Sequence, residues 1–185
     1  MKISASYWVT NPGNTPKGAA REFINPEWIP WTDWILPNTK FRLLYCNLAT
    51  GQFTILLRVD KNESVTGPGL SHWHTANLQG LILEGGFYYS EGDDQGLPGY
   101  YICEVGGAVH APYAPEGLLM LLISDGPIVC YDADGKIEAI GDASLHYALA
   151  QQNGATTHTM LVNYVGPRAL VKVAGNENKD DVKAT

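Results

Sequence analysis

The sequence Ser-His-Trp-His at residues 71–74, together with His110 after the run Gly106-Gly107-Ala108-Val109, carries the most information about this chain. In a β-strand, residues i and i+2 face the same side about 6–7 Å apart, so His72 and His74 can bind one metal ion side by side. His110, arriving on a returning strand, can complete a cap of three imidazoles. Because such a cap leaves coordination positions open, it is more typical of a catalytic than of a structural metal site.

Each of these histidines also has a simpler interpretation. His72 and His74 could be surface residues on an exposed strand face, and His110 could be a core histidine whose ring is satisfied by a backbone carbonyl. The chain has only 5 histidines, however, and three of them share this one arrangement. That concentration favours the metal site.

The composition indicates one folded domain. A length of 185 residues, 45% apolar and 17% charged, suits a compact domain with its own core. The net charge of −7 argues against a nucleic-acid partner. Because no apolar run is long enough for a membrane span and no secretion signal is visible, we expect a cytoplasmic protein. The 3 cysteines (Cys46, Cys103 and Cys130) contain no C-x-x-C pair, which favours small buried hydrophobes in a reducing compartment.

Turn residues divide the chain into three segments. Residues 1–40, which are rich in proline and tryptophan, predict an extended arm. Its tryptophans are expected to cover the domain or a subunit interface, and the alternative is that they line a ligand pocket. Packing of such an arm between subunits predicts a homodimer or homotetramer. Residues 41–170 form the predicted domain. Residues 171–185 end in a polar stretch and predict a flexible tail.

Short apolar runs between turns predict an all-β sandwich or barrel, a closed jelly roll, with a single late helix. Strands are expected at residues 41–46, 53–59, 70–74, 78–84, 87–90, 100–103, 110–113, 118–123, 128–131, 136–139 and 156–165. Gly85-Gly86 and Asp134-Gly135 are interpreted as hairpin turns. Asp142 predicts the N-cap of a helix over residues 143–152 that ends at Gly154, with His146 partly exposed on it. His158 is interpreted as structural.

The spacing of these landmarks resembles the cupin superfamily. Its first motif runs H-x-H, three or four residues, Glu, six residues and Gly; its second runs Gly, five residues, Pro-x-Gly, two residues, His, three residues and Asn. This chain offers His72, His74, Gln79 and Gly86 for the first motif, and Gly99, Val105, Gly107, His110 and Ala114 for the second. The resemblance implies a single jelly-roll cupin domain in which His72, His74 and His110 bind a metal.

The wider stretch from Phe41 to Asp142 resembles a narrower branch of that superfamily. The branch holds acetylacetone dioxygenase, 2,4'-dihydroxyacetophenone dioxygenase and the cupin domain of a zinc-containing anti-sigma factor. This resemblance implies a non-haem iron(II) dioxygenase, ring- or chain-cleaving, that uses dioxygen to break a carbon–carbon bond in a β-dicarbonyl or hydroxy-aryl-ketone substrate. Zinc, nickel and manganese remain alternative metals. A non-catalytic zinc-binding sensor or ligand-binding module, and a metal-dependent isomerase or lyase, remain alternative functions.

Gln79 stands where most cupins have a carboxylate ligand. Three neutral imidazoles would leave a divalent ion with its full +2 charge, which should favour an anionic substrate such as an enolate. Gln79 could still form a hydrogen bond to a metal-bound oxygen, and Glu91 or Glu104 could act as a further ligand or orient an imidazole. No general base is assigned. Strand alternation predicts an apolar and aromatic pocket wall made of Phe87, Tyr89, Tyr101, Leu119 and Leu121.

Overall fold

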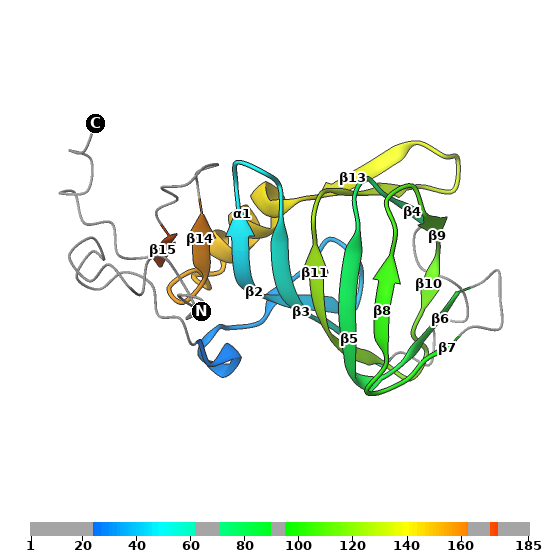
Figure 1. Cartoon of the computed structure of the whole chain (residues 1–185), viewed down its shortest axis with the longest axis horizontal. Helices are drawn as coiled ribbons and strands as arrows, with labels where there is room; N and C mark the ends of the chain where they lie inside the picture. The colour runs from blue at the N-terminus through cyan, green and yellow to red at the C-terminus, as the bar shows by residue number, and fades with distance from the viewer. Residues whose placement is uncertain (1–23, 62–70, 90–94, 163–170, 174–185) are drawn as a thin grey trace, which may run out of the picture.

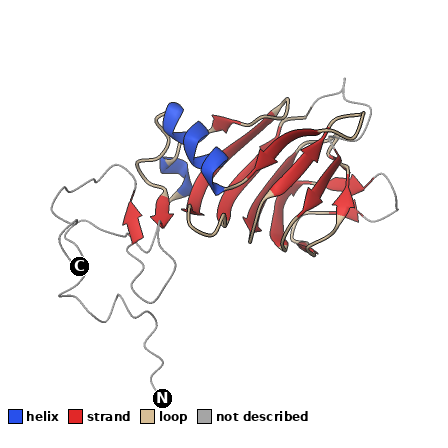
Figure 2. Cartoon of the chain, turned by 90° about the horizontal axis from the view of Figure 1, so that it is seen from above, coloured by secondary structure: helices blue, strands red, loops and turns tan. Residues whose placement is uncertain are grey.

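A computed structural model describes residues 24–61, 71–89, 95–162 and 171–173 of the chain. Two curved β-sheets face each other as a jelly roll, and the helix lies at one end (Figures 1 and 2). The all-β fold with one C-terminal helix is therefore confirmed. In the part of the chain that the structure describes, no helix is long and apolar enough to span a bilayer.

The larger sheet has the strand order β15-β14-β2-β3-β11-β5-β8, with β1 paired to β2. Its strands are β1 (Thr32–Asp33), β2 (Thr39–Asn47), β3 (Phe53–Val59), β5 (Leu78–Gly85), β8 (Tyr101–Glu104), β11 (Leu118–Ser124), β14 (Met160–Val162) and β15 (Val171–Val173). All neighbours pair antiparallel except β14 and β2, which run parallel. Of the strand expected over residues 156–165, residues 160–162 form β14, residues 156–159 are not extended, and residues 163–165 lie outside the described residues.

The second sheet has the order β13-β12-β4-β9, and a third small sheet has the order β10-β6-β7. These strands are β4 (Ser71–His74), β6 (Phe87–Tyr89), β7 (Gln95–Gly96), β9 (Val109–His110), β10 (Pro112–Tyr113), β12 (Ile128–Tyr131) and β13 (Ile137–Gly141). The Asp134-Gly135 hairpin between β12 and β13 is confirmed by their antiparallel pairing. The single strand expected over residues 110–113 is divided into β9 and β10, which pair with different partners.

Alternation along β11 shows how the sequence forms the core. Leu118, Met120, Leu122 and Ser124 are buried, while the residues between them are only partly covered. Because successive side chains in a strand point to opposite faces, one side of β11 faces the interior between the sheets and the other faces outward. Phe41, Phe53 and Ile55 on neighbouring strands complete this core with side chains that are almost fully buried.

Gly85-Gly86 forms a sharp corner between sheets, and its interpretation as a hairpin turn is wrong. β5 pairs with β11 and β8, whereas β6 pairs with β10 and β7, so the chain leaves one sheet and enters another at this point. Gly85 has φ +69°, and a Cβ atom there would lie 2.1 Å from the carbonyl oxygen of Gly117. Glycine is therefore required at this position both by the positive φ angle and by the close approach of the Gly117 backbone, just before β11.

Helix α1 (Ala143–Gln152) begins and ends as predicted, with the Asp142 carboxylate accepting a hydrogen bond from the Leu145 N–H. The prediction that His146 is partly exposed is wrong, because its side chain is fully buried. Its ring stacks on Phe53 with centroids 4.2 Å apart and meets Phe41 edge-on at 5.0 Å. Nδ1–H of His146 donates to the Asp142 carbonyl at 2.6 Å. Burial lowers the pKa of His146 from 6.5 to about 4, so this histidine is part of the core in its neutral form.

Residues 24–40 lie against the barrel, with η1 (Pro26–Trp28) as a short 3-10 helix. Ile29 is almost fully buried, and the Arg42 guanidinium both pairs with the Glu27 carboxylate and lies 4.3 Å from the centroid of the Trp31 ring. The remainder of the predicted arm, residues 1–23, and the predicted tail beyond residue 173 lie outside the described residues.

Folding stability should fall as the pH drops below about 6.5, partly because of His146. In the unfolded chain this histidine takes up a proton near pH 6.5, whereas the folded protein resists protonation until about pH 4. Below pH 4 the free energy of unfolding should have fallen by about 3 kcal/mol from this histidine alone. His146→Phe, which keeps an aromatic ring in the core, should therefore lose less stability than the wild type between pH 7.5 and 4.5. Urea unfolding of both proteins at several pH values measures the difference, and parallel pH curves would contradict the assignment.

Candidate metal centre

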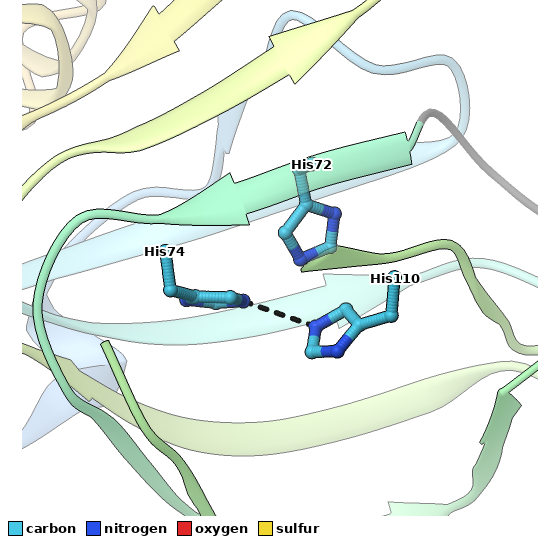
Figure 3. Close-up of side chains that lie close together, drawn as sticks. All are labelled: His72, His74 and His110. Atoms are coloured by element: carbon cyan, nitrogen blue, oxygen red, sulfur yellow. Dashed lines mark hydrogen bonds between the residues drawn. The ribbon is translucent and has the colours of Figure 1, made fainter. Parts of the chain in front are cut away.

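Three imidazole rings converge between the two sheets (Figure 3). His72 and His74 lie on the same face of β4, as their spacing of two residues requires. His110 lies on β9 and is paired directly with His72 across the two strands. The ring centroids are 4.8 Å apart for His72 with either partner, and 4.9 Å apart for His74 and His110.

One pair of ring nitrogens already has the separation that a shared metal ion requires. One nitrogen from each ring lies within 4.8 Å of the others, and the Nε2 atoms of His74 and His110 are 3.0 Å apart. Two ligands at about 2.1 Å from one ion and at a right angle to each other would lie about 3.0 Å apart. His72, His74 and His110 could therefore hold a divalent ion, and their geometry does not by itself identify the element.

His74 is held in the neutral form that metal ligation needs. Its side chain is 1% exposed, and burial, reinforced by the neighbouring His72 and His110, lowers its pKa to about 3. A neutral imidazole keeps a lone pair available for a metal. Nδ1 of His74 is buried and has no hydrogen-bond partner among the described residues.

A carboxylate joins the histidines from the facing sheet. The Oε2 atom of Glu104, at the end of β8, lies 3.2 Å from Nε2 of His74, and its Oε1 atom lies 3.2 Å from Nε2 of His110. Burial raises the pKa of Glu104, and the hydrogen bond that the Tyr89 hydroxyl donates to Oε1 opposes this rise. Two ring nitrogens and a carboxylate this close together need either shared protons or a shared cation.

Tyr89 connects two members of the cluster. Besides its hydrogen bond to Glu104, its ring lies against the ring of His110 with centroids 4.6 Å apart. The sequence placed Tyr89 in the pocket wall by strand alternation, and the structure places it beside the histidines themselves. Tyr89 therefore restricts the positions of both Glu104 and His110.

Gln79 points away from the cluster, so the prediction that it could form a hydrogen bond to a metal-bound oxygen is wrong. Its side-chain oxygen accepts a hydrogen bond of 2.8 Å from the Tyr101 hydroxyl on the outer face of the sheet. The inward position on β5 is Leu78, which is paired across the strands with Glu104. Glu104, which the sequence offered as a further ligand or as a residue that orients an imidazole, does lie beside the histidines, and its ionised form would reduce the net charge of a divalent site from +2 to +1.

A cavity of about 440 Å³ leads away from this cluster through the interior. His72 and Glu104 line it together with mostly apolar side chains, among them Leu78, Phe87 and Met120. Phe87 lies in the wall as predicted. Trp34 also lines the cavity, which is the alternative role that the sequence left open for the tryptophans.

Three wall residues were predicted on the wrong side of their strands. Leu119 and Leu121 lie on the outer face of β11, whereas Leu118, Met120 and Leu122 line the cavity. Tyr101 is 63% exposed on the outer face of β8. In each case the sequence shows that the side chains alternate between two faces but not which face points inward.

Of the cysteines, Cys130 is buried in the cavity wall and Cys46 in the core, but Cys103 is exposed beside Tyr101.

Glu91, the other carboxylate proposed near the metal, lies outside the described residues.

Cys130 was expected only as a buried hydrophobe. It is the cross-strand partner of His72, and burial raises the pKa of its thiol to about 11, so the group is a neutral part of the wall.

The chain is similar in sequence to one family and in fold to several solved structures. Residues 19–129 match the ChrR Cupin-like domain family. An RmlC-like cupin from Ralstonia eutropha JMP134 shares 16% identity over 74% of this chain and 88% of its own, with a TM-score of 0.65. An acetylacetone dioxygenase from Acinetobacter johnsonii shares 18% identity over 72% of this chain and 93% of its own, with a TM-score of 0.57.

A protein from Methylibium petroleiphilum PM1 that bears the provisional name acetylacetone dioxygenase shares 15% identity over 70% of this chain and 93% of its own, with a TM-score of 0.61. At such identities the similarity demonstrates the fold alone. No curated protein matches the chain.

Glu104→Gln should weaken metal binding by about 10- to 100-fold, because the substitution removes the negative charge beside two ligands and disturbs their orientation. Gln79→Ala is the matched control, since Gln79 lies on the neighbouring strand but faces outward. Competition with a chelator on zinc-loaded protein measures both affinities. Equal affinities of the wild type and Glu104→Gln would exclude Glu104 from the metal centre.

Proposed function

The chain belongs to the ChrR cupin-like domain family, and on that premise we propose that it is an iron(II)-dependent dioxygenase that cleaves a carbon–carbon bond in a β-dicarbonyl or hydroxy-aryl-ketone substrate. One observation carries the proposal: three imidazoles that could hold a metal lie together, and one of them, His72, lines a cavity with mostly apolar walls. The name acetylacetone dioxygenase on two proteins of similar fold supports the choice of substrate class.

The residues of the chain have distinct roles in this proposal. His72, His74 and His110 bind the metal from one side, and His72 is the ligand that borders the cavity. Glu104 adds negative charge to the site, and Tyr89 holds its carboxylate in place. A bound iron(II) ion would supply the electron transfer to dioxygen, which amino-acid side chains do not provide. Leu78, Phe87 and Met120 exclude water from the reacting carbonyl groups.

The proposed reaction balances without an outside reductant. A β-diketone R–CO–CH₂–CO–R′ reacts with one molecule of dioxygen, and the bond between one carbonyl carbon and the central carbon breaks. The products are the acid R–COOH and the 2-oxoaldehyde R′–CO–CHO, which together retain both oxygen atoms of dioxygen. The electrons that reduce dioxygen come from the cleaved substrate.

A second candidate function is a non-catalytic zinc-binding module that senses or stores a ligand. Glu104 favours this alternative, because three histidines and one carboxylate provide four protein donors. Four protein donors around zinc are typical of closed, structural sites, whereas catalytic sites keep a position open. The metal content and the response to dioxygen distinguish the two functions.

Purified protein should contain close to one iron per chain and consume dioxygen when a diketone or a hydroxy-aryl ketone is added. His72→Ala should lose both iron and oxygen uptake, because a ligand that borders the cavity is removed. His158→Ala is the control, since His158 lies outside the cluster and contacts the ring of Trp28. Metal analysis and an oxygen electrode measure the two properties. A stoichiometric zinc protein without oxygen uptake would support the second function, and iron retained by His72→Ala would contradict the ligand assignment.

A further inference from the structure

We infer that the substrate of this protein carries an extended apolar body, an aryl or long alkyl group, attached to the carbonyl end that lies at the metal centre. The inference rests on the proposed function and narrows its substrate class. On this inference, acetylacetone and other short diketones are too small to be the substrates that fill the cavity.

The size of the cavity is the first reason. Its volume of about 440 Å³ lies within the range of about 300–1,000 Å³ that is typical of sites for drug-sized ligands. A short diketone bound at His72 would fill only the end of the cavity beside the metal centre. The rest of an apolar cavity would then be left without a partner, and its wall would lose the contacts that a filling ligand provides.

The cavity also extends far from the metal centre. Glu104 lines it on β8, and Leu57 and Val59 line it on β3. These strands are separated by β5 and β11 in the sheet, so three inter-strand steps of about 4.8 Å place them about 14 Å apart along the curved sheet. A molecule that reaches both ends must be several times longer than its chelating carbonyl pair.

The chemistry of the wall defines the body of the ligand. Leu57 is paired with Met120, and Val59 is paired with Leu118, so two cross-strand pairs present only apolar atoms to the part of the cavity that lies far from the metal centre. The exposed residues Pro37 and Asn38 also line it, and the Asn38 carbonyl accepts a hydrogen bond from the N–H of Asp60, the residue after Val59. The geometry therefore fits a ligand with a polar carbonyl head at Glu104, an apolar body along β11 and β3, and a far end that reaches solvent.

The test compares diketones of increasing length on zinc-loaded protein, because zinc does not support oxidation and so separates binding from turnover. Isothermal titration with acetylacetone, 1-phenylbutane-1,3-dione and 1,3-diphenylpropane-1,3-dione gives the dissociation constants. Both phenyl compounds should bind at least tenfold more tightly than acetylacetone. The same three ligands with free zinc ion in buffer correct for differences in their intrinsic affinity for the metal.

A pair of variants on one strand separates cavity binding from general hydrophobicity. Leu57→Trp should fill the part of the cavity that lies far from the metal centre, lowering the affinity for the phenyl compounds at least tenfold and leaving that for acetylacetone unchanged. Leu56→Trp adds the same side chain on the opposite face of β3 and should change neither. Val59→Phe, two residues farther along β3 in the same cavity wall, provides the same test if Leu57→Trp does not fold.

The outcomes distinguish this inference from the proposed function. If all three diketones bind equally, or if Leu57→Trp leaves the preference for phenyl compounds intact, the extended substrate is excluded while chelation at the metal centre stands. If no diketone binds to the zinc-loaded protein, both the proposed substrate class and the inference drawn from it are overturned.

Discussion

The pairing of β4 with β9 is the constraint on which the site depends. It places His72 directly opposite His110, and the alternation of β4 adds His74 on the same face. A shift of β4 by one residue would turn both histidines outward and bring Trp73, which is 37% exposed, into the interior. The packing of this sheet against β8 then brings Glu104 to the same point. Four potential ligand residues thus converge from three strands of two sheets.

The surrounding structure restricts how far this cluster can move. His74 is buried, the Tyr89 hydroxyl holds Glu104, and the sharp corner at Gly85 allows the chain to pass from β5 into the strand that carries Tyr89. Keeping a carboxylate and three imidazoles out of water is unfavourable unless they share protons or a cation. A bound divalent ion would relieve that cost, so metal binding and folding stability should be coupled in this protein.

Most of the fold could be predicted from the sequence, because turn residues and apolar runs define strands locally. The bounds of β3, β12 and α1 were predicted to the residue. The histidine cluster was predictable because i and i+2 spacing fixes a shared face. The sequence could not show which face of β11 points inward, since leucines occupy both faces. Gly85-Gly86 was misassigned because the same pair of glycines suits a hairpin turn and a corner between sheets. The position of Glu104 depends on how two sheets pack, and the burial of His146 depends on Phe41 and Phe53, which are distant in sequence.

The central claim, that one divalent ion is shared by the three histidines, is tested most directly by the anomalous scattering of a crystal of the metal-loaded protein. A single peak about 2.0–2.2 Å from a ring nitrogen of each of His72, His74 and His110 is the predicted result. A metal bound elsewhere on the chain, or a loaded protein in which these three rings point to different places, would contradict it.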